Sequence, residues 1–410
     1  MIRQEVPAVL TPLDDHMGLD IARSLAKRGV RVLGLDPDPG VPGRHSRYLE
    51  FALCPDSNKD KEGFVKFLVR FARDLGCKPV LYPLSDRTAL VCSGHRAELR
   101  DCYEFVMPDH RTMVSLATKD GLLAAAREFG IPAPRTCPVS GPEELEALAG
   151  TLSYPVLLKP TESTYWQAPQ VALALRRGLL TGQPKVRVCG GPEELMEEYR
   201  RIAALDSRLL VQEVIPGEDE RLAYICFYLD RASKPLGIFA GRKCRVLPTG
   251  FGSASFVRGM TDPRLNDLAL RLLSGTRYQG LGGMEFKKDP RDGEYRLIEF
   301  NTRFGMWDGL AAHGGVDLAA IAYDDALGRP VESRLAYRDD VAWIDWQRDF
   351  RAFLEYRRRG RLSCGAWLRS LKGRKMWAVY SRDDWRPGVA LTVRLLRKLW
   401  DRAVGKGARP

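Results

Sequence analysis

The sequence predicts an α/β protein with a doubly wound parallel sheet near its start and antiparallel sheets further on. Residues 6–11 and 30–36 are short apolar runs, and apolar residues recur at helical spacing between them, as in a strand-helix-strand unit. Residues 280–289 and 294–301 alternate apolar and charged residues around the turn 290–293, as the strands of an antiparallel hairpin do. A chain of 410 residues exceeds one compact core and indicates about two to four domains.

The other predicted elements follow in order along the chain. Helices are expected at 64–75, 119–130 and 191–205, and strands at 80–86, 155–160, 209–215, 222–229 and 236–241. The turn after the first strand reads TPLDDHMG and lacks GxGxxG, so no dinucleotide site is expected there. Ser85 and Asp86 follow a strand at the edge where open α/β sheets bind ligands, so either they touch a substrate or Asp86 caps the next helix.

The composition is that of an ordinary globular protein, with 45% hydrophobic and 28% charged residues. No apolar run approaches the roughly 20 residues that cross a bilayer, and the N-terminus does not resemble a signal peptide. The nine cysteines include no CxxC pair, which argues against a disulfide framework. We therefore expect a cytoplasmic protein.

The positive charge is concentrated at one end of the chain. The formal net charge is +12, and residues 331–410 alone hold 20 Lys and Arg against 9 Asp and Glu. The same segment contains six of the eight Trp. It is therefore a basic, Trp-rich extension of an otherwise nearly neutral protein.

Two predicted strands carry oxygen ligands on one face. Glu299 and Asn301 lie two residues apart, so their side chains point the same way, and Glu285 lies on the partner strand. Carboxylate and amide oxygens without a His or Cys cluster suit Mg²⁺ better than zinc. Arg303 falls on the same face if the strand continues, where it would meet a phosphate. The alternative for these residues is a solvated, charged sheet face.

Other charged residues stand at strand ends or among apolar neighbours. Lys159 ends an apolar strand, where a lysine is commonly just solvated. Glu213 lies between apolar residues, where a carboxylate is costly without a partner. Glu220 follows the Pro216-Gly217 turn and is suited either to a ribose hydroxyl or to plain surface charge.

The order of these motifs resembles the ATP-grasp superfamily. Lys119 before a helix and Lys159 at a strand end are followed by QEVIPGEDE, GMEF and IEFNTRF. More narrowly, the chain resembles the branch of predicted carboligases and D-aspartate-ligase-like carboxylate–amine ligases, in which GRKCR and a similar C-terminal extension occur. The resemblance covers residues 1 to about 330 and, more weakly, the extension.

The resemblance implies a role for each of these residues. Lys119 and Lys159 would hold ATP phosphates, Glu213 would accept from the adenine amino group beside backbone contacts of Val214 and Ile215, and Glu220 would bind ribose. Glu285, Glu299 and Asn301 would hold two Mg²⁺, for which Mn²⁺ could substitute, and Arg303 would face the γ-phosphate or an acyl phosphate. Arg242, Lys243 and Arg245 would bind phosphate or a substrate carboxylate, unless they belong to a helix or loop surface.

One segment departs from the family pattern. The phosphate-covering loop after Lys159 is normally rich in Gly and Ser, whereas here it is longer and contains Trp166. Within it, Ser163 can donate to phosphate and Lys185 could match the basic residue that ends the loop.

The implied domains are a pre-ATP-grasp α/β domain (1–112), the small-lobe region (113–208), the large-lobe region with the Mg-ATP site (209–330) and a helical basic extension (331–410). The implied reaction converts a small-molecule carboxylate to an acyl phosphate, which an amine then attacks. His313 lies just after the predicted metal strand, where it either touches substrate or is an ordinary loop histidine.

Other function classes stay open. The chain could be an ATP-binding sensor or scaffold without ligase activity. Nucleic-acid binding through the basic extension lacks a recognisable module, so no specific nucleic-acid partner is expected. The sequence does not indicate an oligomeric state.

Residues 388–404 can form an amphipathic helix. Val389, Val393, Leu396, Trp400 and Val404 fall on one stripe with Leu399 beside it, and Arg394, Arg397, Lys398 and Arg402 lie on the other side. Such a helix suits either the inner surface of a membrane, or another acidic partner, or packing of the stripe on the catalytic body. The five other Trp of the extension favour packing.

Overall fold

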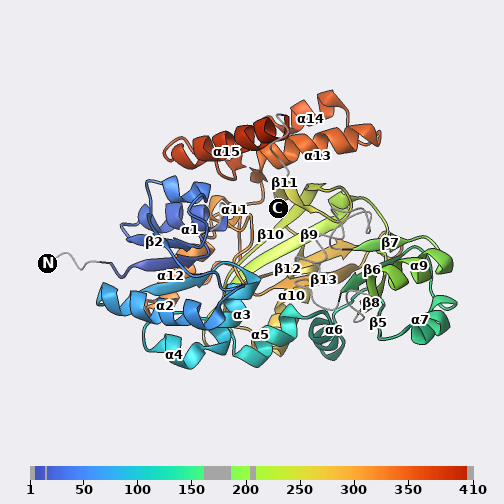
Figure 1. Ribbon diagram of the computed structural model, residues 1–410, viewed down its shortest axis with the longest axis horizontal. Helices are drawn as coiled ribbons and strands as arrows, with labels where there is room; N and C mark the ends of the chain where they lie inside the picture. Colours follow the sequence, from blue (N-terminus) through green and yellow to red (C-terminus); the bar gives the residue numbers. More distant parts are fainter. Residues whose placement is uncertain (1–4, 14–15, 161–185, 204–208, 404–410) are drawn as a thin grey trace.

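The computed structural model describes residues 5–13, 16–160, 186–203 and 209–403, and three β-sheets form its framework (Figure 1). Their strand orders are β3-β2-β1-β4, β5-β8-β6-β7 and β13-β12-β9-β10-β11-β14-β15. The long seven-stranded sheet lies between the other two, with the first sheet on the left of Figure 1 and the small second sheet on the right. This arrangement confirms the predicted α/β class with parallel and antiparallel parts.

The first sheet is parallel throughout. Its strands are β1 (Ala8–Thr11), β2 (Val32–Asp36), β3 (Glu50–Leu53) and β4 (Val80–Pro83). Leu10 packs on the side of α1 (Met17–Ala26), whereas Val9 packs on the side of α2 (Lys61–Leu75), so both faces are covered. The short helices η1 (Pro42–His45), α3 (Asp86–Gly94), α4 (Arg96–Arg100) and α5 (His110–Ala117) complete this part. Coverage on both faces is what makes its strands continuous apolar runs.

The second sheet is antiparallel and small. It contains β5 (Thr136–Val139), β6 (Val156–Pro160), β7 (Arg187–Cys189) and β8 (Leu209–Glu213). The helices α7 (Pro142–Ala149) and α9 (Pro192–Ala203) pack on it, and α6 (Lys119–Glu128) precedes it. Because β8 pairs with β5 and β6, a boundary between 208 and 209 would separate β8 from its sheet. We therefore propose that the boundary follows Glu213.

The third sheet carries the main core. Its strands are β9 (Leu222–Leu229), β10 (Pro235–Leu247), β11 (Ser253–Gly259), β12 (Gly280–Lys288), β13 (Tyr295–Asn301), β14 (Ala342–Ile344) and β15 (Met376–Trp377). One face packs on α6 and α10 (Pro263–Gly275), and the other on α1, α11 (Leu310–His313) and α12 (Leu318–Ala326). Asp219–Arg221 form the short helix η3 just before β9.

Two sequence-based expectations about this sheet can be compared directly. The predicted hairpin is confirmed, because β12 and β13 pair antiparallel and the Gly293 N–H donates to the Asp289 carbonyl at 2.8 Å. Gly293 has φ +79°, a conformation that favours glycine. The expected strand 236–241 is too short, since β10 continues to Leu247, so GRKCR lies in a strand rather than on a helix or loop.

The C-terminal extension is built into the fold. It contributes β14 and β15 to the third sheet, and its helices α13 (Trp346–Arg358), α14 (Cys364–Ser370) and α15 (Arg386–Ala403) form a layer at the top of Figure 1. The buried Asp384 accepts hydrogen bonds from Arg23 at 3.0 Å and Ser46 at 2.8 Å in the first domain. The extension therefore contacts both the first domain and the third sheet.

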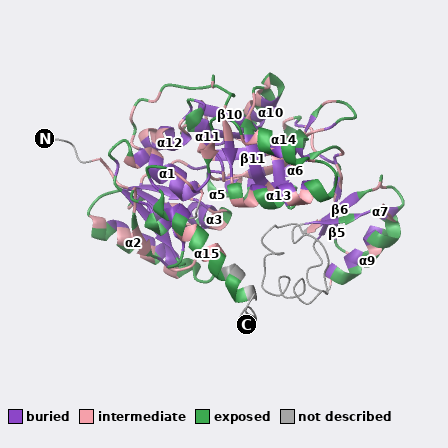
Figure 2. Cartoon of the chain, turned by 90° about the horizontal axis from the view of Figure 1, so that it is seen from above, coloured by how far each residue is buried: buried purple, intermediate pink, exposed green. Residues whose placement is uncertain are grey.

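The amphipathic helix α15 is seated differently from the expectation. Its apolar stripe of Val389, Val393, Leu396 and Trp400 is between 41% and 69% exposed, and Figure 2 shows the outer side of α15 in green. The inner side uses Gly388, whose Cα lies against the Tyr380 ring, and the half-buried Leu391. The expectation that the stripe packs on the catalytic body is therefore wrong, because the opposite side of the helix makes those contacts. Val404 lies outside the described residues, as do the side chains of Lys398, Leu399 and Arg402.

Candidate active site

The three predicted metal ligands share one face of the third sheet. Glu285 on β12 stands opposite Glu299 on β13, and Asn301 stands opposite Gly283. Met284 and Phe286, which flank Glu285, are fully buried on the other face. Strand alternation thus places two carboxylates and one amide side by side, as the sequence predicted. Among the residues that the structure describes, no group of three or more His, Cys, Asp and Glu could hold a metal.

Two lysines from other segments reach the same place. Lys119, the first residue of α6, lies with its Nζ 3.7 Å from Glu299 Oε1 and donates to the Ile298 carbonyl at 3.4 Å. Lys159 on β6 donates to Gln212 Oε1 at 2.6 Å. Burial is the main cause that lowers the pKa of Lys159 to about 7; Lys119 lowers it further, while Glu299 and Glu285 act against this. Residues far apart in the sequence therefore form one electrostatic unit.

Gln212 is a member of this site that sequence reasoning missed. It is buried on β8, donates to Thr136 Oγ1 at 2.8 Å, and accepts from Lys159. These two bonds fix its amide and thereby the direction of the Lys159 side chain. The available signal was a polar residue inside the apolar strand LLVQE.

Of the three basic residues on β10, only Lys243 joins the metal ligands. Its ammonium forms an ion pair with Glu285, and both side chains are mostly buried. Arg242 is the preceding residue, so alternation turns it to the opposite face of the strand, where it is exposed.

Arg245 has a different partner. Its Nε and Nη2 donate to the two carboxylate oxygens of Asp349 on α13 at 2.7 and 2.9 Å, and both residues are buried. A β-bulge between Lys243 and Arg245 breaks the alternation of side chains along β10. Lys243 and Arg245 therefore do not point to the same partner, although they are two residues apart. Any contact of Arg245 with phosphate or substrate would share its guanidinium with Asp349, and this role stays a prediction.

Arg303 lies where the third sheet meets the first domain. Its Nε is 3.0 Å from Asp86 Oδ1, and its Nη1 donates to the Phe304 carbonyl at 3.0 Å. The cap of α3 is Ser85, through a reciprocal pair of bonds with Thr88, rather than Asp86 as the capping alternative had it. Asp86 instead holds Arg303, so the edge of the first sheet closes one side of the site.

A buried polar cluster adjoins Arg303. Tyr224 on β9 stands opposite Glu285, and its buried hydroxyl has no hydrogen-bond partner among the described residues. Asp308 is buried and accepts from the Gly305 N–H at 2.6 Å; burial raises its pKa to about 7, and this N–H and Arg303 oppose the rise. A Cβ at Gly305 would lie 2.6 Å from both Tyr224 Oη and Asp308 Oδ1, so only glycine leaves room for this pair. No sequence pattern indicated this cluster, because Asp308 becomes buried only through tertiary contacts.

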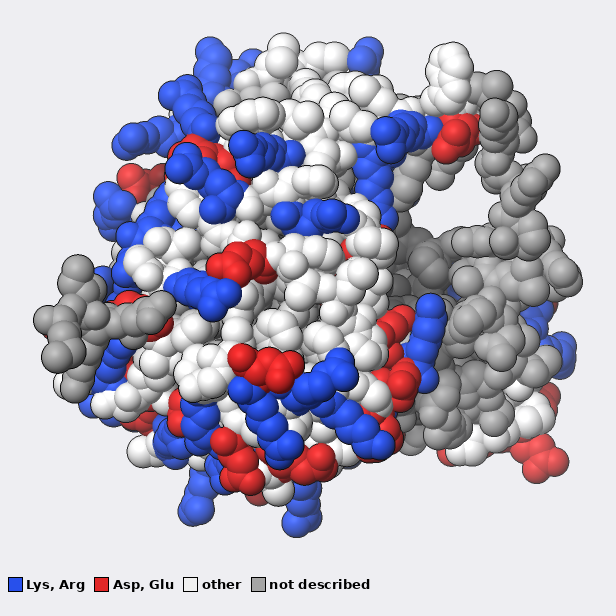
Figure 3. All heavy atoms as spheres, turned by 60° about the vertical axis from the view of Figure 1, so that its left-hand side comes forward, with Lys and Arg blue, Asp and Glu red and all other residues white. Residues whose placement is uncertain are grey.

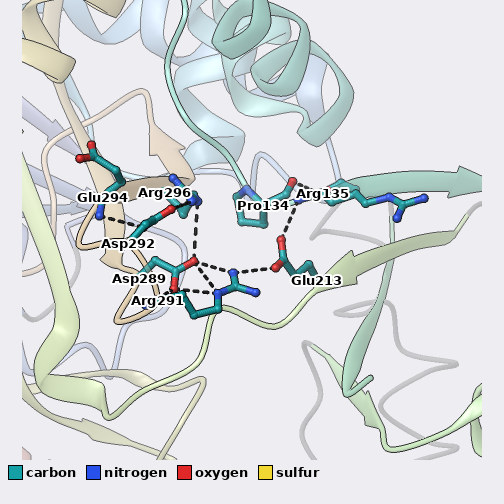
Figure 4. A network of polar contacts seen from close by, with 9 residues as sticks. Pro134, Arg135, Glu213, Asp289, Arg291, Asp292, Glu294 and Arg296 are labelled. Carbon is teal, nitrogen blue, oxygen red and sulfur yellow. Dashed lines mark hydrogen bonds and ion pairs between the residues drawn. The ribbon is translucent and has the colours of Figure 1, made fainter. Parts of the chain in front are cut away.

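At the other end of the site, Glu213 connects two sheets (Figure 4). Its carboxylate accepts from the Arg135 N–H at 3.3 Å and lies 2.6 Å from Arg291 Nη2, in the turn between β12 and β13. Arg291 in turn binds the buried carboxylate of Asp289. Any adenine contact of Glu213 would share its carboxylate with Arg291, and this role stays a prediction.

The remaining predicted residues are placed as follows. Ile215 is buried and Val214 half-buried directly after β8, where the chain passes from the second sheet to the third, and Glu220 is exposed in η3. His313 is exposed at the end of α11. Ser163 and Lys185 lie outside the described residues.

Comparison with known proteins bears on this geometry. No family model matches the sequence. D-aspartate ligase of Enterococcus faecium is 26% identical over 304 residues, which span 71% of this chain and 69% of that protein. The biotin carboxylase domain of Hydrogenobacter thermophilus 2-oxoglutarate carboxylase, crystallised with MgADP and bicarbonate, has a TM-score of 0.61 at 17% identity over 83% of this chain and 74% of its own. L-amino acid ligase of Bacillus licheniformis has a TM-score of 0.58 at 15% identity over 81% of this chain and 76% of its own.

The three sheets have the arrangement of the ATP-grasp fold. Within that fold, the chain is similar in sequence to D-aspartate ligase.

Proposed function

We propose that this protein is an ATP-dependent ligase that joins a small carboxylate to an amine. The observation that carries the proposal is the convergence of Lys119 and Lys159 on Glu285 and Glu299. Phosphate oxygens need cations and a divalent metal needs hard oxygen ligands, and this face offers both within one site.

The donor set fits Mg²⁺ bound together with a nucleotide. Mg²⁺ keeps an octahedral shell and is usually held by one or two carboxylates plus substrate phosphates. Glu285, Glu299 and Asn301 would hold one or two such ions, with Mn²⁺ as an alternative, and the bound metal would neutralise phosphate charge. Lys119 and Lys159 would bind ATP phosphates, and Gln212 orients Lys159.

The chemistry proceeds in two steps. A carboxylate oxygen of the substrate attacks the γ-phosphorus, so that the bond to the β,γ-bridging oxygen breaks and ADP leaves with an acyl phosphate formed. The amine nitrogen then attacks the acyl carbon, a proton leaves the nitrogen, and phosphate departs. The chain contributes positioning and charge neutralisation, with Lys243 and Arg303 placed to stabilise the transferred phosphoryl group.

We infer that the carboxylate and amine substrates bind beside Arg303. The cation of Arg303, the buried Asp308 and the Tyr224 hydroxyl, which has no hydrogen-bond partner among the described residues, lie together where the first domain meets the third sheet. A guanidinium suits a carboxylate, and an acid suits an ammonium. These groups therefore match an amino acid among the substrates.

The location follows from general features of the chain. No described helix combines the length and apolarity needed to cross a membrane. All nine cysteines are free, as in proteins of reducing compartments. We therefore propose a cytoplasmic protein with a peripheral membrane contact, which is argued below.

An ADP-release screen tests the function. The protein would be incubated with MgATP and pairs of amino acids and small carboxylates, including D-aspartate. We expect ADP release that requires both members of one pair, with a condensed product detected by mass spectrometry. Tight MgATP binding without ADP release from any pair would instead support a nucleotide sensor or scaffold.

A further inference from the structure

Exposed apolar side chains are concentrated in the C-terminal layer. Among the described residues, 13 large hydrophobic side chains are exposed, and nine of them lie between 346 and 400. These nine are Trp346, Phe350, Leu368, Trp377, Trp385, Val389, Val393, Leu396 and Trp400. Single exposed apolar residues are normal, but a cluster on one layer marks an interaction surface.

Helix α15 has apolar residues on two sides, and only one side is used inside the protein. The inner side faces η1 and the first domain, where Leu391 packs and Arg394 Nη2 lies 3.0 Å from Asp38 Oδ2. The outer side holds Val389, Val393, Leu396 and Trp400, with Trp385 just before the helix. Because the inner contacts already hold the helix in place, the outer stripe is available to something outside the chain.

The same layer is strongly basic. Between residues 346 and 401, two acidic side chains are exposed in the described structure, Asp383 and Asp401. Eleven basic side chains are exposed there: Arg351, Arg357, Arg358, Arg359, Arg361, Arg369, Lys372, Arg374, Arg382, Arg386 and Arg397. Figure 3 shows the upper part of the molecule mainly in white and blue, with little red. On a helical wheel, Arg386 and Arg397 border the exposed stripe.

We propose that the layer of α13, α14 and α15 docks on an anionic lipid surface. An apolar stripe with Trp bordered by Arg is what a helix lying in the membrane interface requires. Trp385 and Trp400 suit the headgroup level, where an aromatic ring with a polar N–H is favoured. The helix lies on the surface rather than across it, which agrees with the absence of a membrane-crossing helix among the described residues.

The charge distribution disfavours other occupants of this surface. In a symmetric dimer through α15, the same basic patch would face itself, and like charges would repel. A nucleic acid would match the charge but offers little apolar surface to the stripe of Val389, Val393 and Leu396. Anionic lipid satisfies both the charge and the apolar requirement.

Co-sedimentation with vesicles tests the proposal on the full chain. We expect binding to phosphatidylcholine vesicles that contain phosphatidylserine, and at least tenfold weaker binding to phosphatidylcholine alone. Each basic residue near an anionic surface contributes roughly fivefold in affinity, so Arg386→Gln with Arg397→Gln should weaken binding about 25-fold. Raising the salt concentration should weaken it in the same direction.

The apolar contribution is tested by Val393→Glu with Leu396→Glu, two exposed positions where the fold should tolerate the change. We expect loss of vesicle binding with an unchanged thermal unfolding midpoint. Val114→Glu is the matched control, because Val114 is an exposed valine on the distant helix α5 and its substitution should leave binding intact.

Three results would overturn the proposal. The first is no vesicle binding at low salt, and the second is equal binding to neutral and anionic vesicles. The third is a dimer in light scattering that Val393→Glu with Leu396→Glu dissociates, without vesicle binding by the wild type. That result would assign the stripe to a second copy. All three measurements are independent of ligase activity.

Discussion

Lys159 has a pKa that is strongly lowered by its surroundings in the fold. Its pKa of about 7 is far below that of a free lysine, and burial is the main cause. The free energy that burial costs the ammonium is offset when phosphate oxygens approach it. In the proposed function, the same residue would therefore couple nucleotide binding to proton uptake.

This coupling predicts a pH dependence. Below pH 7 Lys159 is mainly charged and attracts phosphate, and above pH 7 it is mainly neutral, so nucleotide affinity should fall as pH rises through 7. The fall should approach roughly tenfold per pH unit. Calorimetric titration of MgADP at several pH values measures it. Lys159→Arg keeps the charge and controls for titration of the nucleotide itself, so identical pH profiles of the two proteins would contradict the prediction.

A second prediction concerns Glu299, which faces both Glu285 and Lys119. Glu299→Gln removes a negative charge from the proposed metal site at almost constant volume, so ADP formation should fall by at least about a hundredfold. The fold should remain stable, because Glu299 is half-exposed. Glu294→Gln, an exposed acid preceding the same strand, should retain activity. Wild-type turnover of Glu299→Gln would exclude Glu299 from the site.

At the scale of elements, the buried carboxylate of Asp349 joins α13 to the third sheet. Asp349 accepts from Nε and Nη2 of Arg245, from Ser255 Oγ at 3.1 Å and from Trp367 Nε1 at 2.9 Å. Four bonds converge on a single group, so the helix cannot shift without breaking all of them together. A buried pair with this many partners fixes one arrangement of α13 and α14 against β10.

Substitution of Asp349 should therefore be costly. Asp349→Asn leaves the Arg245 guanidinium buried without a counter-charge, and we expect a loss of about 3–5 kcal/mol in the free energy of unfolding. Denaturant titration measures it. Asp383→Asn is the matched control, because Asp383 pairs with Lys27 at 2.8 Å on the surface, where a pair contributes about 0–1 kcal/mol. Equal losses for the two variants would show that Arg245 does not depend on Asp349.

At the scale of the whole molecule, the proposed catalytic site and the C-terminal layer occupy different places in the fold. The site lies between the three sheets, whereas α15 rests on the first domain through η1 and Arg394 (Figure 1). No described residue of α15 contributes to the cluster of Lys119, Lys159, Glu285 and Glu299. Catalysis and docking should therefore be separable.

Removal of residues 387–410 tests this separation. The truncated protein should keep ADP formation within about twofold, because the site residues and their supporting contacts remain, and it should lose vesicle binding. Both are measured on the same preparation, with circular dichroism to confirm the fold. Loss of ADP formation in a folded truncated protein would show that α15 supports the site after all.

The sequence alone determined what depends on neighbours along the chain. Alternation in β12 and β13 placed Glu285, Glu299 and Asn301 on one face, and apolar periodicity located the strands and helices of the first domain. Tertiary structure decided the rest. In the folded protein Gln212 bonds to Lys159, and Arg245, next to a β-bulge, pairs with Asp349. The apolar stripe of α15 is exposed. The physical reason is that burial and pairing depend on residues distant in the chain, and a helix with two apolar sides does not specify from its own sequence which side the body will cover.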